Sequence, residues 1–197
     1  MNYLGHAYLS FNDPELLVGN MAGDYVKGLV ALEKFPARVK DGYLLHRKID
    51  HYADMHPANQ RAKLIFRGDF GLYSGAIIDT IYDHFLANDA KIFPTETALH
   101  QFTQEVYIML DSKVYLLPEK FAQYYPKMKE QNWLFHYRSV KGAERSLQGL
   151  ARRAIHMPPI EPAYMAFITN YYYLNQCYFD FIDDLVKYVR TEISALK

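Results

Sequence analysis

The stretch SGAIIDTIYDHFLAN, residues 74–88, predicts an amphipathic α-helix. Its apolar side chains recur at helical spacing and form one stripe: Ile77, Ile78, Ile81 and Phe85. Ser74 is a candidate N-cap, because a serine hydroxyl can accept a free backbone N–H at the start of a helix. We expect this helix to bury its apolar stripe against other helices of the same chain.

Helical spacing of apolar residues extends from this segment in both directions, with Gly and Pro mostly between the segments. Asp13 and Pro14 predict a helix start, with Asp as N-cap and Pro in the first turn. Gly19, Gly23 and Gly28 indicate a broken segment after it. The remaining predicted helices are 36–55, one starting at Pro57, 95–113, 118–130, 140–155 and a last one ending near Ser194. The sequence predicts an all-α fold, a single-domain helical bundle over residues 1–197.

Composition limits the possible functions. The 197 residues are 50% hydrophobic, and 22 Lys and Arg balance 22 Asp and Glu. This balance argues against a protein that coats nucleic acid or an anionic membrane through net charge. No apolar run approaches the roughly 18 residues of a membrane span, and the first basic residue is Lys27, so we expect neither a span nor a signal peptide.

The single cysteine excludes an internal disulfide and a zinc site built on several thiolates. We therefore expect a cytoplasmic protein. Cys177 lies in the aromatic run of residues 171–179, which indicates packing rather than a nucleophile's electropositive pocket. The Glu-x-x-His pairs of di-iron bundles, a His-Glu-x-x-His motif, a P-loop and a dinucleotide-binding glycine pattern are all absent from the sequence.

Histidines and aspartates gather on the predicted helices of the first 84 residues. His46, Asp50 and Asp54 are spaced four residues apart, which places neighbouring members on one helix face, and Asp79 and Asp83 repeat the spacing. Two helices that present carboxylates and an imidazole to each other can hold a divalent cation inside a bundle. Such pairs are also common on solvated helix faces and at caps, so spacing alone leaves both interpretations open.

Other residues of this type have a weaker pattern. Asp24 follows the glycine-broken segment and could add a third wall to the cation site. His6 lies between apolar residues, which by itself favours a hydrogen-bonded core histidine. The remaining histidines have no carboxylate at a telling spacing and are expected on the surface or in packing: His51, His56, His100, His136 and His156.

One segment is strongly basic. Five cations between residues 138 and 153 outnumber the one acidic residue, Glu144: Arg138, Lys141, Arg145, Arg152 and Arg153. Such a patch can dock an acidic partner, although a helix with one solvated basic face is the commoner explanation.

Several blocks of this sequence, taken in order, resemble the acyl carrier protein phosphodiesterases. They are MNYLGH (1–6), GNMAGDYVKG (19–28), HRKID (46–50) and DHFL (83–86), followed by WL (133–134), YR (137–138) and GLARR (149–153). The resemblance runs from residue 1 to about 155. Beside the HRKID block the family commonly has Thr-Asp where this chain has Ala53-Asp54, so Asp54 is a weaker site residue than Asp50.

The resemblance implies an all-helical fold related to the HD-domain phosphohydrolases and a divalent metal, Mn²⁺ or Mg²⁺. The implied partner is holo-acyl carrier protein, whose phosphodiester between 4'-phosphopantetheine and a serine would be hydrolysed. On this interpretation the metal ligands or their immediate neighbours are Asp24, His46, Asp50 and Asp83. Arg47 would face the phosphate, and either His6 or His84 would protonate the leaving serine oxygen.

Carrier proteins are generally acidic, so the resemblance also favours Arg138, Arg152 and Arg153 as docking residues. Two other hypotheses remain. One is an HD-like phosphohydrolase that acts on a nucleotide or another small phosphate ester, since a fold does not fix a substrate. The other is a helical module that binds a carrier protein without cleaving it.

Overall fold

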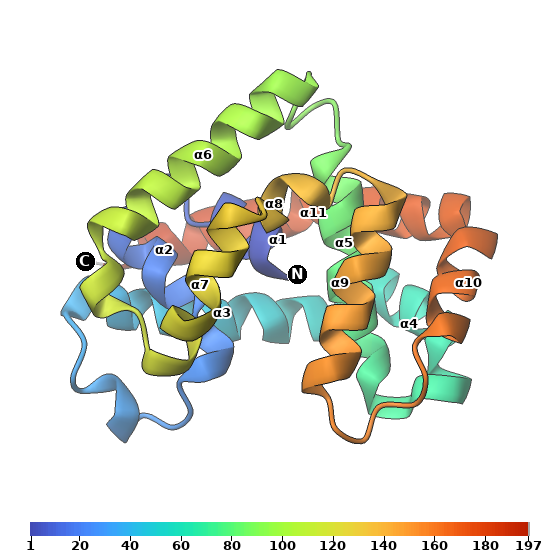
Figure 1. Ribbon diagram of the computed structural model, residues 1–197, viewed down its shortest axis with the longest axis horizontal. Coiled ribbons are helices and arrows are strands. Elements are labelled where there is room, and N and C mark those ends of the chain that lie inside the picture. The colour runs from blue at the N-terminus through green and yellow to red at the C-terminus, as the bar shows by residue number, and fades with distance from the viewer. Residues whose placement is uncertain (197) are drawn as a thin grey trace.

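The computed structural model describes residues 1–196, which form helices joined by turns and loops, with no strand among these residues (Figure 1). The all-α prediction is confirmed. The helices are α1 (Tyr3–Tyr8), α2 (Pro14–Met21), α3 (Ala37–Met55), α4 (Pro57–Phe70), α5 (Ser74–Ala87), α6 (Glu96–Ser112), α7 (Glu119–Glu130), α8 (Trp133–His136), α9 (Val140–Arg153), α10 (Glu161–Thr169) and α11 (Tyr171–Ser194). The predicted end of the domain at residue 197 lies outside the described residues.

Most predicted helices are confirmed to within two residues, and their ends have the expected chemistry. Asp13 caps α2, where its Oδ1 accepts the backbone N–H groups of Glu15 and Leu16. Pro14 occupies the first turn, where its missing N–H costs nothing. His56 separates α3 from α4 and accepts the Ala58 N–H through Nδ1.

Three features of the helices differ from the prediction. Ser74 is the first residue of α5 rather than its N-cap, because its hydroxyl donates to the Gly71 carbonyl instead of accepting an N–H. The predicted last helix is two helices, α10 and α11, which meet at Asn170. The short helices α1 and α8 were not predicted, since a single turn or two shows no apolar periodicity.

The spacing of the glycines predicted that Gly19 interrupts the helical structure. Gly19 instead lies inside α2, at the contact with α3. A Cβ atom on Gly19 would lie 2.2 Å from the Val39 carbonyl oxygen, and one on Gly42 of α3 would lie 2.4 Å from the Leu16 carbonyl oxygen. The two helices therefore touch backbone to backbone. This contact brings residues at the end of α2 next to the middle of α3.

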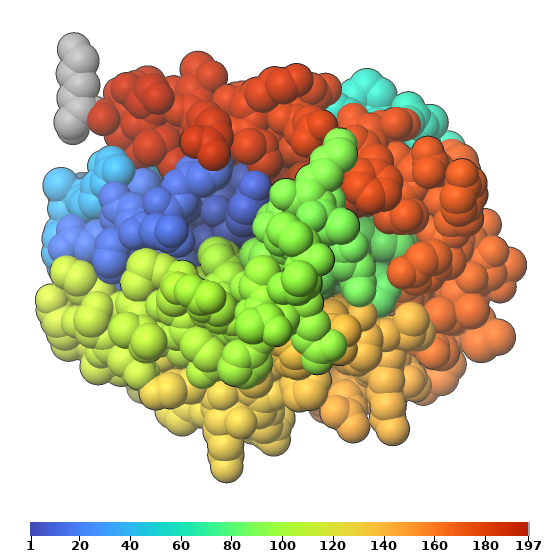
Figure 2. All heavy atoms as spheres, turned by 90° about the horizontal axis from the view of Figure 1, so that it is seen from above, coloured from blue at the N-terminus to red at the C-terminus, as the bar shows by residue number. Residues whose placement is uncertain are grey.

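The central helix is α5, whose predicted apolar stripe is fully buried. It packs against α1, α4 and α9, and Figure 1 shows α5 and α9 standing side by side across the end of α3. From above, α11 runs beside the N-terminal segment, where the Arg190 guanidinium lies 4.3 Å from the centre of the Phe11 ring (Figure 2). The buried apolar side chains form one contiguous cluster. Within residues 1–196 no helix is both long and apolar enough to cross a membrane.

The close contact of α2 and α3 gives a first prediction. Gly19→Ala forces a methyl group into the Val39 carbonyl, so the free energy of unfolding should fall by at least about 2 kcal/mol in urea denaturation. Gly68→Ala is the matched control. Gly68 lies inside α4 with no heavy atom within 4 Å of an added Cβ, so there the same change should stabilise by about 0.5–1 kcal/mol. Equal effects at both positions would contradict the backbone contact.

Candidate metal centre

His46 and Asp50 lie one turn apart on α3, as their spacing predicts. His46 Nε2 is 3.1 Å from Asp50 Oδ2 and 3.5 Å from Oδ1 of Asp24, which follows α2 in a 3₁₀ turn (Gly23–Tyr25). His46 is buried, whereas the Asp24 side chain is 81% exposed. The structure therefore brings together three of the four predicted metal ligands, Asp24, His46 and Asp50.

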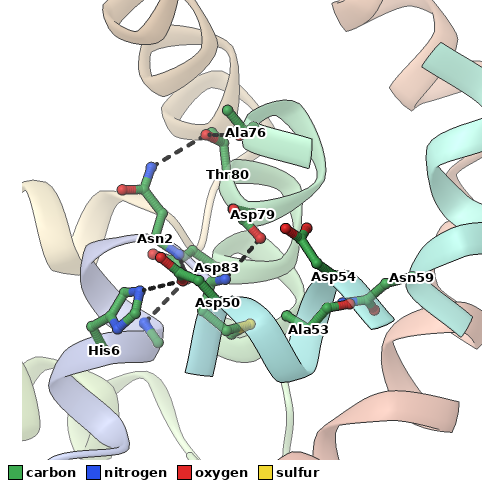
Figure 3. A network of polar contacts seen from close by, with 12 residues as sticks. Asn2, His6, Asp50, Ala53, Asp54, Asn59, Ala76, Asp79, Thr80 and Asp83 are labelled. Atoms are coloured by element: carbon green, nitrogen blue, oxygen red, sulfur yellow. Dashed lines mark hydrogen bonds and ion pairs between the residues drawn. The ribbon is translucent and has the colours of Figure 1, made fainter. Parts of the chain in front are cut away.

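His6 joins this group from α1. Its ring stacks on that of His46, with ring centres 4.1 Å apart. Its Nε2 lies 3.3 Å from Asp50 Oδ1 (Figure 3). One ligand atom each from His6, His46 and Asp50 all lie within 4.8 Å of one another. His6 is buried, as its apolar neighbours in the sequence predicted, and it is also part of the site.

The outer nitrogens of both rings are engaged by Asn20, near the end of α2. His6 Nδ1 lies 2.8 Å from the Asn20 side-chain oxygen, and the amide nitrogen of the same side chain donates to the His6 carbonyl and to Ser10. His46 Nδ1 lies 2.7 Å from the Asn20 backbone carbonyl. Because these oxygens only accept hydrogen bonds, both histidines must carry a proton on Nδ1.

A proton on Nδ1 leaves Nε2 of each neutral ring with a lone pair. His6 Nε2 is buried and has no hydrogen-bond partner, although the Asp50 carboxylate is close. A lone pair facing a carboxylate is unfavourable unless a cation or a proton lies between them. A histidine that gives its other N–H to a carbonyl is the usual arrangement of a metal ligand. These donors therefore fit a divalent cation.

The pKa shifts of His46, Asp50 and His6 also favour a cation among these residues. Burial acts against a charged His46, but the carboxylates of Asp24 and Asp50 outweigh it and raise its pKa to about 10. Burial also opposes ionisation of Asp50, yet contacts with His46 and His6 hold the pKa of Asp50 below its usual range. Burial, and then the charge of His46, lower the pKa of His6. Without a metal, one imidazolium therefore neutralises part of the negative charge.

Asp83, the fourth predicted metal ligand, is placed elsewhere. Its carboxylate is fully buried and accepts the backbone N–H groups of Asn2, Leu4 and Gly5 at 3.0, 2.7 and 3.1 Å. It thus satisfies the free N–H groups at the start of α1, the helix that carries His6 (Figure 3). Burial raises its pKa to about 7 despite these hydrogen bonds. Asp83 positions His6 and does not join the cluster.

His84 points to a different part of the molecule from its neighbour Asp83. Its Nδ1 donates to the Tyr137 carbonyl at 2.7 Å, and its Nε2 lies 2.9 Å from the Tyr171 hydroxyl. Both ring nitrogens are therefore engaged away from the cluster. Of the two histidines considered as proton donors, the structure brings only His6 to the site.

Three more residues that the sequence pattern singled out make contacts outside the cluster. Arg47 donates to the backbone carbonyls of Val26 and Gly28, so it holds the loop that follows Asp24. Asp54 forms an exposed ion pair with Lys63, away from His6. Asp79 forms an ion pair with the N-terminal ammonium group, with Met1 N 2.7 Å from Asp79 Oδ1.

The basic segment is divided between two surroundings. Arg138 pairs with Glu96 at 2.7 Å and lies over the Phe135 ring, so its charge is already balanced. Arg152 and Arg153 are exposed at the end of α9. Arg153 also lines a cavity whose wall includes Asp24.

Two site residues were missed in the sequence analysis. Asn20 was quoted in the GNMAGDYVKG block without a role, and only the fold shows that one residue meets both rings. Gly23 lies under the His46 ring, where an added Cβ would be 2.1 Å from His46 Cγ. A polar residue between two glycines in a buried segment is the signal that could have revealed them.

Asp83 provides a test of how the site is positioned. Asp83→Ala leaves the N–H groups of Asn2, Leu4 and Gly5 at the start of α1 without this acceptor, so the free energy of unfolding should fall by about 3 kcal/mol or more in urea denaturation. Asp54→Ala, which removes an exposed carboxylate, should cost less than about 1 kcal/mol. A small loss for Asp83→Ala would contradict its role as the anchor of α1.

The comparisons with known proteins agree with the sequence motifs. The family model described as acyl carrier protein phosphodiesterase matches residues 1–185. The acyl carrier protein phosphodiesterase of Photorhabdus laumondii is 32% identical over 154 residues, 78% of this chain and 77% of the relative. The Escherichia coli O6:H1 protein of the same name is 30% identical, over 78% and 79% of the two chains.

A third relative of the same name, from Serratia proteamaculans, is 26% identical over 95% of this chain and 96% of its own. No solved structure matches the chain, so the relation to HD-domain phosphohydrolases stays a prediction. The family match extends beyond residue 155, where the recognisable motifs end. By this match and by the identity to its relatives, the chain belongs to the acyl carrier protein phosphodiesterase family.

Proposed function

We propose that this protein hydrolyses the phosphodiester that joins 4'-phosphopantetheine to a serine of holo-acyl carrier protein. The oxygen of a water loses a proton and forms a bond to phosphorus, the bond from phosphorus to the serine oxygen breaks, and the serine oxygen takes up a proton. The products are apo-carrier protein and free 4'-phosphopantetheine. The observation that carries this proposal is the family match over residues 1–185.

We place the reaction in the cytoplasm, where a free, buried Cys177 fits a reducing compartment.

We further propose that Mn²⁺ or Mg²⁺ is the cofactor and that His6, His46 and Asp50 hold it. The mixture of imidazole and carboxylate donors and the unpartnered His6 Nε2 support this assignment. When bound, a divalent ion supplies a Lewis acid for a phosphoryl oxygen and lowers the pKa of water. Compared with the sequence analysis, His6 becomes a ligand and Asp83 a positioning residue.

The chain's own groups have distinct parts in this proposal. Asn20 keeps both Nε2 atoms directed at the site by accepting the two Nδ1 protons. Asp24, exposed beside the cluster, accepts hydrogen bonds from water that enters from the cavity. Arg47 fixes the loop behind Asp24 and so keeps that carboxylate against His46.

Mass spectrometry of purified holo-acyl carrier protein tests both proposals together. With Mn²⁺ present, the carrier should shift to the apo mass, and a chelator should prevent this. Asp50→Asn should slow the conversion more than about 100-fold and weaken Mn²⁺ binding in calorimetry, because a charged ligand is lost. Asp54→Asn, four residues further along α3, is the matched control and should stay near the wild-type rate.

The other outcomes separate the alternatives. Conversion that survives chelation, or an Asp50→Asn variant with full activity, would contradict the metal site. If the protein binds Mn²⁺ but leaves the carrier mass unchanged, phosphate release from a panel of nucleotides tests the small-ester hypothesis. If it binds the carrier without metal and without cleavage, the binding-module hypothesis replaces the enzyme.

We also propose that the exposed cations of α9 guide the acidic carrier to the site. Within residues 1–196, neither Arg145 nor Arg152 forms an ion pair, whereas Arg138 is paired with Glu96. Charges of this kind change the rate and orientation of encounter, and salt screens them.

Salt dependence tests this docking surface. The double variant Arg145→Ala/Arg152→Ala should raise the KM for holo-carrier protein several-fold at low ionic strength and much less at high salt, with little change in kcat. Arg138→Ala is the control for losing a cation from the same segment, and its effect should be smaller because Glu96 already balances that charge. A KM change that does not depend on salt would contradict electrostatic docking.

A further inference from the structure

A cavity of about 210 Å³ lies beside the metal cluster. Its wall is built by the start of α1, the turn that holds Asp24 and Tyr25, the first half of α5 and the end of α9. Asp24 belongs to this wall and also lies 3.5 Å from His46 Nε2. The cavity and the cluster therefore share one side chain, and a molecule in the cavity would have one end against the cluster.

The cavity wall carries two carboxylates, Asp24 and Asp79, and two cations, the Met1 ammonium group and Arg153. Asp79 is paired with the ammonium group of Met1, and Asp24 is in contact with His46. Arg153, the last residue of α9, is also on the wall, and among residues 1–196 it makes no ion pair. Its charge reaches the Tyr3 and Tyr25 hydroxyls, where it opposes the rise in pKa that burial causes. Among residues 1–196, Arg153 is therefore the cation on this wall that no ion pair engages.

Neutral donors stand next to this cation. The hydroxyls of Tyr3 and Tyr25 lie 2.6 Å apart, so one donates to the other and the second keeps a free proton. Asn2 uses its amide group to donate to Thr80, which leaves one amide hydrogen unused. Ala76 and Leu150 complete an apolar part of the wall. An arginine with hydroxyl and amide donors beside an apolar wall suits a phosphate group attached to an organic chain.

We propose that this cavity binds the phosphate end of the 4'-phosphopantetheine arm and that Arg153 binds its phosphoryl oxygens. The inference rests on the proposed function and adds a substrate-binding residue to it. It also changes the role of Arg153, which the sequence analysis had placed on the carrier-docking surface. Arg47, predicted to face the phosphate, is instead occupied with the loop at Val26 and Gly28.

A purely structural role for Arg153 makes a different prediction. A cation at the C-terminal end of a helix stabilises that helix by interacting with its dipole. If this were the only role of Arg153, its removal would lower the stability of the protein without changing any ligand preference. The readout must therefore be the binding of the phosphate group itself. Comparing 4'-phosphopantetheine with pantetheine isolates that group, because the two ligands differ only by the phosphate.

Isothermal titration calorimetry of the full chain with these two ligands, with Mn²⁺ and after chelation, tests the proposal. The wild-type protein should bind the phosphorylated ligand about ten- to a hundredfold more tightly than pantetheine, also without metal. Arg153→Ala should abolish most of this preference, and Arg153→Lys should restore part of it, since lysine is a cation without the planar fork. Arg152→Ala, which removes the neighbouring cation outside the cavity, should keep the preference.

Equal affinity of the wild-type protein for both ligands, or no binding of either, would overturn the inference. So would an Arg153→Ala variant that keeps the preference, or an Arg152→Ala variant that loses it to the same extent. The proposed function fails separately: a protein that prefers the phosphorylated ligand through Arg153 but never cleaves holo-carrier protein would keep this inference and lose that function. Cleavage of the carrier without a preference for the phosphorylated ligand would keep the proposed function and overturn this inference.

Discussion

The site depends on the two hydrogen bonds by which Asn20 accepts the Nδ1 protons of His6 and His46. One acceptor is the side-chain oxygen and the other is the backbone carbonyl, so a single residue fixes two rings that come from different helices. Asn20 can reach both because α2 touches α3 backbone to backbone at Gly19. With their outer nitrogens used, the rings have only Nε2 to offer, and both Nε2 atoms face Asp50.

The sequence predicted what depends on local periodicity. The four-residue spacing of His46 and Asp50 placed them on one face of a long helix, and the structure confirms both the helix and the contact. The same spacing on α5 did not show what Asp83 would meet. Whether a buried carboxylate faces a cluster of ligands or the start of α1 is decided by how helices far apart in the sequence pack together. His6 likewise lies in an apolar stretch that no periodicity distinguishes from core, and only the family resemblance moved it to the site.

Electrostatics connect the site with its surroundings. A phosphodiester is an anion, and it must approach two carboxylates, Asp24 and Asp50, that lie against the histidines. A divalent cation held by His6, His46 and Asp50 would reduce this repulsion, and Arg153 on the cavity wall would attract the anion. In the proposed reaction the two cations would therefore act together on the phosphodiester.

Anomalous diffraction from crystals grown with Mn²⁺ tests the central claim most directly, because it locates the ion without relying on activity. We expect one ordered peak bound by Nε2 of His6, Nε2 of His46 and a carboxylate oxygen of Asp50, with both Nδ1 atoms still directed at Asn20. A peak bound by Asp83, or an ordered site with no peak and with His6 Nε2 still unpartnered, would contradict it.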